Sequence, residues 1–562
     1  MLTGCASLPS GSQVVSGRVG GHEQPIDDPY VRIIPVGPGR DWDPDTIVRA
    51  FRTASASFDG PNGEHKVARG YLACAGCWRP GVASIVYDQL DPSLVQLKGD
   101  QASVTVEGKQ LGRIGSDGQY LADSRRFKQI FGLRLDAQKQ WRITDLPPEL
   151  LLSRADVNRA FRTLNLYFFA PDAQVLVPNP VFIPLVNRTW LSVQLLKQLL
   201  GGPTTWLRWA GVRTGFPDGT QLRRLDISGG LATVDLSRQA RAGDLRNMSV
   251  QLMWTLRQLH EVEQLKLEID GKAVQVAGVS GTVQSASDWA GFDPNGTGEP
   301  PPAYVRTAEG RLGRLNDKLV QALLPKLRVS HPAVSYDRRQ VAALNDARDT
   351  VTVSDLIGGL TRVVLPARLK GGRFSTPSWD SRGNVWAVES NAGGSRLWEI
   401  EGGTTTVAVD GWTLSPYPVK ALRISRDGTR AAAIVQVDGV SQVQLGRVDR
   451  APSGGLQAEG FIAISSELQS AIDLAWRNAD HLAVVGVTQG NPSPLLYDVP
   501  VSGAAIQPMV GPGGDMKAVA AYSGAPLLVT QHVSALDNVC RLSDKYGEWK
   551  CFPRASDPAY PG

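Results

Sequence analysis

The second half of the chain repeats one pattern, a short strand followed by a polar turn and an apolar strand. This repeat limits the possible folds more than any other feature. Its turns contain Asp337, Asp380, Asp427 and Asn478, which follow one another at intervals of 43, 47 and 51 residues. A period of roughly 40–50 residues, with several short strands in each unit, is typical of β-propeller blades. Residues 303–562 therefore predict an all-β propeller of about six blades.

The end of the chain suggests how such a ring would close. Cys540 and Cys551 flank a turn-forming stretch at residues 543–547, which predicts a hairpin whose facing strands bring the two thiols together. We expect this tail hairpin to close the ring of blades, and a disulfide within it to lock the closing strand.

The other cysteines indicate in which cellular compartment the protein resides. The motif L-T-G-C ends at Cys5 and matches the cleavage box of bacterial lipoproteins, so we predict that Cys5 carries a lipid. Only four residues precede it, fewer than a signal peptide needs, so we expect the precursor to start upstream. The remaining four cysteines suit disulfides outside the cytoplasm. Cys540 with Cys551 is one candidate pair, and Cys74 with Cys77 is either a local disulfide or two buried thiols.

Between the lipid box and the repeats, the chain has two α+β regions. Residues 1–29 are rich in Ser, Gly and Pro and predict a flexible tether. In residues 30–151 a helix is expected to start at Asp43, with Pro44 just inside it. A strand is expected at 103–107, and a hairpin at 133–135 and 141–144. Helices followed by antiparallel strands resemble the nuclear-transport-factor-like fold. The apolar face of the first helix is formed by Ile47, Val48, Phe51 and Ala54.

Residues 152–290 carry four motifs in a fixed order. They are an L-Y-F strand at 166–168, a helix that ends in L-L-G-G-P at 199–203, a V-D-L strand at 234–236 and a strand that ends in D-G at 270–271. Gly at a helix end and Pro just beyond it are common stop signals. The ordered set resembles a GerMN domain, a module of spore-germination lipoproteins. Residues 291–302, rich in Pro and Gly, predict a linker.

No motif in the chain indicates catalysis, a cofactor or a metal ion. The six histidines are dispersed, and no P-loop, dinucleotide-binding or G-x-S-x-G motif occurs. The net charge of +5 is spread along the chain, so nucleic acid is not an expected partner. No run of about 20 apolar residues occurs, so the lipid would be the only anchor. We therefore expect a binding protein rather than an enzyme.

Two tryptophans directly follow the G-G-P stop. Trp206 and Trp209 either are exposed aromatic side chains that bind a partner or glycan, or pack in the core.

Taken in order, the lipid box, tether, two α+β regions and propeller resemble the LpqB lipoproteins of mycobacteria and other actinobacteria. The resemblance is carried by N-L-Y-F at 165–168, L-L-G-G-P at 199–203, W-T-L at 254–256 and I-S-R-D-G-T-R-A-A at 424–432. It implies a protein anchored by lipid to the outer face of the cytoplasmic membrane. It also implies binding to the extracellular domain of a sensor histidine kinase of the MtrAB two-component type, with effects on cell-wall metabolism and division.

Two other functions stay open at this point. A peptidoglycan or glycan binder would use the α+β regions. A hydrolase built on the propeller would need paired catalytic residues, which the sequence does not indicate.

Overall fold

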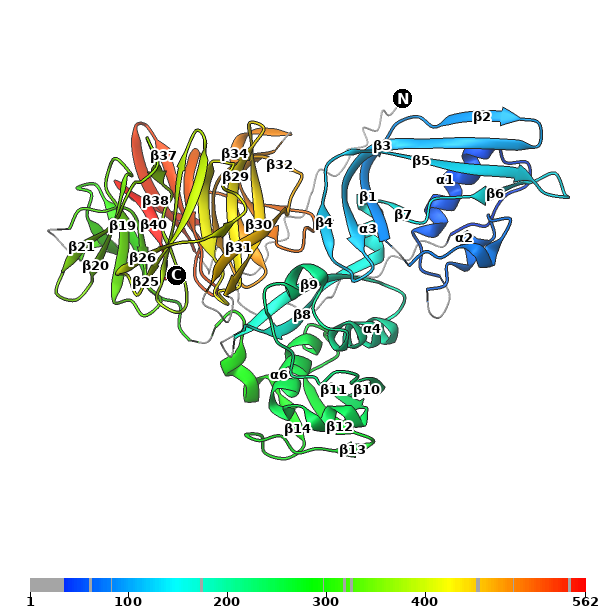
Figure 1. The fold of residues 1–562 in the computed structure, drawn as a ribbon, viewed down its shortest axis with the longest axis horizontal. Helices are drawn as coiled ribbons and strands as arrows, with labels where there is room; N and C mark the ends of the chain where they lie inside the picture. Colours follow the sequence, from blue (N-terminus) through cyan, green and yellow to red (C-terminus); the bar gives the residue numbers. More distant parts are fainter. Residues whose placement is uncertain are drawn as a thin grey trace, which may run out of the picture.

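The computed structural model describes residues 35–59, 63–81, 83–171, 175–296, 298–316, 320–323, 327–450, 455–488, 490–543 and 547–562. Figure 1 shows three parts, which we call the N-terminal domain (α1 to α3 with β1 to β7), the middle domain (β8 to η3) and the propeller (β15 to β40). The propeller lies at the left of Figure 1, the N-terminal domain at the upper right, and the middle domain below.

The N-terminal domain begins with the predicted helix. In α1 (Pro44–Ser55), the Asp43 side chain accepts a hydrogen bond from the backbone N–H of Thr46, which satisfies a free donor at the helix start. The expected apolar face is buried, and α1 packs on β3, β6 and β7. Short helices follow at α2 (Lys66–Arg69) and η1 (Ala75–Cys77), and α3 (Arg154–Ala160) ends the domain.

The sheet of this domain is mostly antiparallel and runs β6-β5-β3-β1-β7, with β2 and β4 also paired to β3. The strand expected at 103–107 lies in β3, and the expected hairpin is β5 with β6, where Leu133 faces Ile143. The bounds are β1 (Ala83–Leu90), β2 (Leu94–Lys98), β3 (Gln101–Gly115), β4 (Tyr120–Ala122), β5 (Arg126–Leu135), β6 (Trp141–Asp145) and β7 (Leu150–Ser153).

The middle domain has one apolar core between its helices and sheets. Helices α4 and α6 pack against each other and against β8, which pairs with β9, while β10-β11-β12-β13 form a second sheet with β14 beside β12. The first of these helices ends at Leu200, directly before the G-G-P stop, as predicted. The bounds are β8 (Phe161–Phe169), β9 (Leu176–Pro184), α4 (Arg188–Leu200), α5 (Thr205–Arg208), β10 (Leu222–Ser228), β11 (Leu231–Leu236), η2 (Arg238–Ala242), α6 (Leu245–Leu256), β12 (Gln264–Ile269), β13 (Lys272–Ala273), β14 (Val283–Ser285) and η3 (Ala286–Phe292).

The described strands after residue 302 form a propeller of six blades, as the repeat predicts. Blade 1 contains β15 (Ala303–Thr307), β16 (Leu312–Leu315), β17 (Val320–Ala322) and β40 (Ala555–Ala559). Blade 2 contains β18 (Ser330–Val334), β19 (Gln340–Leu344), β20 (Thr350–Asp355) and β21 (Thr361–Pro366). Blade 3 contains β22 (Arg373–Phe374), β23 (Ser378–Trp379), β24 (Val385–Asn391), β25 (Gly394–Glu401) and β26 (Thr405–Ala408).

The other three blades continue the ring. Blade 4 contains β28 (Val419–Ile424), β29 (Arg430–Val437), β30 (Val440–Arg450) and β31 (Leu456–Ala463), with β27 (Gly411–Trp412) beside β31. Blade 5 contains β32 (Leu468–Trp476), β33 (His481–Thr488), β34 (Asn491–Pro500) and β35 (Gln507–Met509). Blade 6 contains β36 (Asp515–Ala520), β37 (Leu528–Val533), β38 (Leu536–Leu542) and β39 (Trp549–Pro553).

The prediction that the cysteine hairpin closes the ring is wrong. That hairpin is β38 with β39, which are the two outer strands of blade 6. After β39 the chain reverses at Arg554, whose φ is 57°, and enters β40. Strand β40 then pairs antiparallel with β15, so the last strand of the chain is the inner strand of the first blade.

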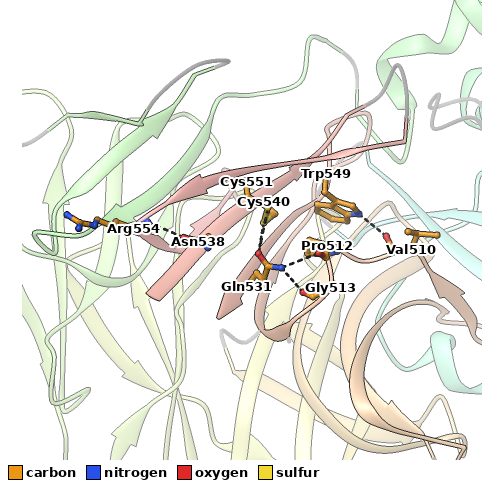
Figure 2. The surroundings of a disulfide bond; sticks show 9 residues. All are labelled: Val510, Pro512, Gly513, Gln531, Asn538, Cys540, Trp549, Cys551 and Arg554. Carbon is orange, nitrogen blue, oxygen red and sulfur yellow. Dashed lines mark hydrogen bonds between the residues drawn. A yellow bond between two sulfur atoms is a disulfide. The ribbon is translucent and has the colours of Figure 1, made fainter. Parts of the chain in front are cut away.

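The hairpin instead forms the outer edge of blade 6, and Figure 2 shows the surroundings of its disulfide. Cys540 and Cys551 face each other across β38 and β39 and form a disulfide, with 3.9 Å between their Cα atoms. Trp549 donates its indole N–H to the carbonyl of Val510 at 3.0 Å. Gln531 donates to the carbonyls of Pro512 and Gly513. Trp549 thus ties the hairpin to the loop that enters the blade, and Gln531 ties the adjacent strand β37 to the same loop.

Removing the Cys540–Cys551 disulfide should destabilise the propeller. The bond closes a loop of 12 residues, for which chain entropy predicts a loss of about 3 kcal/mol in the double variant Cys540→Ala/Cys551→Ala. The matched control is Cys74→Ala/Cys77→Ala, which opens a loop of only four residues and should cost about 2 kcal/mol in the N-terminal domain. Denaturant unfolding measures both. If the propeller were equally stable with and without the Cys540–Cys551 disulfide, the prediction that this bond stabilises it would be wrong.

Candidate functional site at the propeller mouth

The propeller has a cavity at one end of its central channel, which we call the mouth. It holds about 840 Å³ of empty space, part of it open to solvent. The inner strands β18, β28, β32, β36 and β40 end there, and blade 3 contributes residues 376–378. Linker residues Pro294 and Asn295 also line it. Its aromatic and cationic side chains are Tyr336, Arg423, Arg426, Trp476, Tyr522 and Tyr560.

Arg426 lies in the mouth between blades and linker. It donates a hydrogen bond to the Tyr522 hydroxyl at 3.0 Å, and its guanidinium carbon is 5.9 Å from the centre of the Tyr336 ring. Gly296 of the linker sits so close that a Cβ there would be 2.4 Å from this carbon. Burial raises the pKa of the Tyr336 phenol more than Arg426 lowers it, so that phenol is neutral at physiological pH. The mouth therefore presents a cation beside neutral aromatic rings.

Arg423 lines the mouth and connects neighbouring blades. It donates to the carbonyls of Thr376 and Leu422 at 3.2 and 3.0 Å, and it lies 3.5 Å from a carboxylate oxygen of Asp473. The other oxygen of Asp473 accepts from the backbone N–H of Val519 at 3.0 Å. Burial raises the pKa of Asp473 although Arg423 opposes it. Four blades, 3 to 6, are connected through these contacts.

The turn that carries Arg426 is rigid. Asp427 accepts hydrogen bonds from the Ser425 hydroxyl and the Thr429 backbone at 2.7 and 2.9 Å, and it forms a buried ion pair with Arg430. Burial raises the pKa of Asp427, but Arg430 and these hydrogen bonds outweigh burial and lower it. Arg430 also donates to the carbonyl of Ala479 in the next blade at 2.7 Å. The recurring aspartate at this turn is therefore structural.

The linker and the middle domain both attach beside the mouth. The Asn295 side chain accepts from the backbone N–H of Ala479 at 2.9 Å. Asn165 of β8 donates to Asp480 at 2.6 Å, and the other oxygen of Asp480 contacts the His481 ring at 2.8 Å. Asn165 begins the N-L-Y-F motif, so this motif supplies the contact that joins the middle domain to blade 5.

The three domains meet around Trp206. Its indole N–H donates to the carbonyl of Gly460 in blade 4 at 2.7 Å, and the Arg447 guanidinium lies 5.8 Å from its ring centre. Its backbone N–H donates to Gln119 of the N-terminal domain at 3.3 Å. Trp206 is partly buried against the apolar cores of the middle domain and the propeller, so the core-packing alternative holds for it, and it also joins the domains. Trp209, in contrast, is 65% exposed.

A second set of contacts joins the N-terminal domain to its neighbours. Arg154 forms an ion pair with Glu467 of the propeller at 2.8 Å. The Asp117 carboxylate accepts from the backbone N–H of Thr205 in the middle domain at 3.0 Å. Together with Trp206, these contacts fix the orientation of the domains.

The residues predicted from sequence are distributed over the molecule rather than at the mouth. Cys74 and Cys77 form a disulfide in the N-terminal domain, and Cys540 and Cys551 form one in blade 6. Cys5 lies outside the described residues. Within the described part, no cluster of three or more His, Cys, Asp or Glu side chains could hold a metal ion. None of the helices described there has the length and apolar character to cross a bilayer.

Sequence reasoning missed the mouth residues. One signal was available, because Tyr336 and Arg426 each directly precede a recurring turn aspartate. The signal is incomplete: Arg477, at the corresponding place in blade 5, forms an ion pair with Asp498 at 3.1 Å and does not line the mouth. Tyr522 and Asn295 have no comparable pattern around them.

Family models match along most of the chain. One described as the Lipoprotein LpqB beta-propeller domain matches residues 310–561, and one described as the Lipoprotein LpqB N-terminal domain matches residues 37–158. A third, described as Sporulation and spore germination, matches residues 165–275.

Several curated proteins are similar over most of their length. Lipoprotein LpqB of Thermobifida fusca is 34% identical, with 100% of this chain and 97% of that protein covered. Lipoprotein LpqB of Streptomyces coelicolor is 28% identical, with 100% and 96% covered. Lipoprotein LpqB of Mycolicibacterium smegmatis is 24% identical, with 86% and 84% covered.

Two solved structures resemble parts of the chain. TolB from Acinetobacter baumannii is 15% identical with a TM-score of 0.38, and the match covers 46% of this chain and 66% of that one. The first GerMN domain of the sporulation protein GerM from Bacillus subtilis is 26% identical with a TM-score of 0.19, and the match covers 22% and 94%.

The contact between Asp480 and His481 should make stability depend on pH. Burial alone lowers the pKa of His481, but the charge and hydrogen bond of Asp480 outweigh burial and raise it. A raised folded pKa stabilises the protein below the unfolded value of about 6.5, and this contribution is lost as the pH rises through the folded pKa. The melting temperature of the wild type should therefore fall more between about pH 6 and about pH 8 than that of His481→Gln.

Thermal unfolding of both proteins across this pH range provides the measurement. His260→Gln is the control, because His260 is exposed and pairs with Glu261 rather than with Asp480. If the melting temperatures of the wild type and His481→Gln changed with pH in parallel, the His481 imidazolium would not stabilise the folded chain.

Proposed function

The chain belongs to the LpqB family of extracytoplasmic lipoproteins, and we propose that it binds and modulates a sensor histidine kinase of the MtrAB two-component type. The partner of this chain would be the extracellular domain of that kinase. Signalling by the kinase would affect cell-wall metabolism and division. The observation that carries the proposal is the open mouth of the propeller, with Arg426 among aromatic rings on a rigid support. A preorganised surface of this kind favours binding because little side-chain freedom is lost on association.

A binding role fits the mouth better than a catalytic role. The acidic group beneath it, Asp473, is held between Arg423 and the backbone N–H of Val519, so both of its oxygens are engaged. A general acid or base must instead reach a substrate proton. The mouth lining contains no aspartate or glutamate.

The proposed location is the outer face of the cytoplasmic membrane, with a lipid on Cys5 as the anchor. The two disulfides support a compartment outside the cytoplasm. Confinement to the membrane of the kinase would raise the effective concentration of both partners, so a weak interface would suffice.

A peptidoglycan or glycan binder is the second candidate. Trp209 of the middle domain favours it, because an exposed indole can stack on a sugar ring. In a pull-down with peptidoglycan, Trp209→Ala should reduce retention under this alternative and have no effect under the kinase proposal.

Mixing the chain from residue 30 onward with the kinase sensor domain tests the main proposal. We expect a complex with a Kd tighter than about 100 µM, because membrane confinement compensates for modest affinity. Isothermal titration calorimetry gives the affinity, and a reporter of the two-component system gives the signalling. No binding at that concentration, together with unchanged signalling in a deletion strain, would exclude the proposal.

The anchor is tested by mass spectrometry of the native N-terminus. We expect an acyl-modified Cys5, and we expect Cys5→Ser to release the protein from the membrane fraction, since a single thiol accepts the lipid. An unmodified Cys5 in protein that still sediments with membranes would show that another element holds it there.

A further inference from the structure

We propose that the propeller mouth binds an extended acidic peptide segment, and that Arg426 recognises its carboxylate. This inference rests on the proposed function, because the segment would belong to the sensor domain. It assigns a ligand chemistry and a recognising residue to the mouth.

The first observation is a cation without a carboxylate partner. In the described part of the chain, Arg426 forms no ion pair, whereas Arg423, Arg430 and Arg447 each have an acidic partner within 3.5 Å. One of its terminal nitrogens donates to Tyr522, and the remaining N–H groups have no hydrogen-bond acceptor among the described residues. A guanidinium offers five donors in a planar fork that matches a carboxylate.

The second observation concerns the surroundings of that cation. The Tyr522 and Tyr560 rings lie with their centres 6.2 Å apart, and the centre of the Tyr336 ring lies 5.9 Å from the guanidinium carbon of Arg426. No aspartate or glutamate side chain lines the mouth. Apolar walls lower the local dielectric, which strengthens an ion pair formed there. A carboxylate carried on an apolar stem, as in glutamate, fits both features.

The third observation is that the side-chain amide oxygens of two asparagines at the mouth are already engaged. The Asn478 side chain accepts from the backbone N–H groups of Asp480 and His481. The Asn295 side chain accepts from Ala479. A neutral glycan is recognised through several polar side chains that bind its hydroxyls, and these two amide oxygens are not free to accept from one. A peptide needs fewer, since one carboxylate and apolar contacts supply its binding.

The opening of the mouth agrees with a short segment. Its empty space of about 840 Å³ includes open solvent, so the mouth can be reached from outside the propeller. A few residues of a partner could therefore enter it. The rest of the partner would rest on the rim.

A random heptapeptide library, selected on the purified full-length chain, tests the inference. We expect the enriched peptides to contain Asp or Glu at one fixed position. Their affinity, measured by fluorescence polarisation, should fall about tenfold or more in Arg426→Gln, because the charge-assisted pair is lost. Tyr522→Phe keeps the charge and removes the hydroxyl that orients it, so it should weaken binding by a smaller factor.

The matched control is Arg339→Gln, which removes an exposed arginine from the corresponding turn of blade 2. It should leave peptide affinity unchanged, and unaltered thermal unfolding of all three variants shows that they are folded. Enriched peptides without acidic residues, or equal affinity for the wild type and Arg426→Gln, would overturn the inference. Competition by soluble muropeptides but not by acidic peptides would overturn it in favour of a cell-wall ligand.

A second arm separates this inference from the proposed function. Titration of the sensor domain into Arg426→Gln should show the same loss as the peptides. If the wild type binds the sensor domain and Arg426→Gln binds it equally, the inference fails while the proposed function stands. If the wild type does not bind the sensor domain, the proposed function fails instead.

Discussion

The pairing of β40 with β15 is the interaction on which the propeller and its mouth depend. Each blade buries its faces against two neighbours, and six apolar clusters fill the spaces between adjacent blades of the described ring. Strand β40 contributes Ala555 to one of the clusters beside blade 1 and Ala559 to the other. It then continues into Tyr560, which lines the mouth. One strand thus completes the core and one wall of the site.

The contacts between domains extend this dependence beyond the propeller. Asn165 and Trp206 attach the middle domain to blades 5 and 4, and Asn295 and Gly296 hold the linker against the mouth. Because the linker lies against Arg426, a ligand that moves this side chain would also press on the connection between domains. Arg426 therefore belongs both to the mouth and to the contact with the linker.

The sequence predicts the helices, strands and blades better than it predicts how they pack together. The period of the turns predicts six blades, and Asp43 with Pro44 predicts the start of α1, because both signals are local. The closing strand A-S-D-P-A at 555–559 has a proline and no apolar alternation, so nothing in it resembles a strand. Arg426 and Tyr522 are 96 residues apart, and only ring closure brings them together. Trp206 likewise acquires its role from a domain that follows much later in the chain.

The central claim is that the mouth, and not the exposed face of the middle domain, contacts the kinase. Site-specific photo-crosslinking in living bacteria tests it most directly, with a photoreactive amino acid at Ser523 in the mouth or at Trp209. The account predicts a covalent adduct with the sensor kinase from position 523 and none from position 209. An adduct from position 209 alone, or adducts with cell-wall material in place of the kinase, would contradict it.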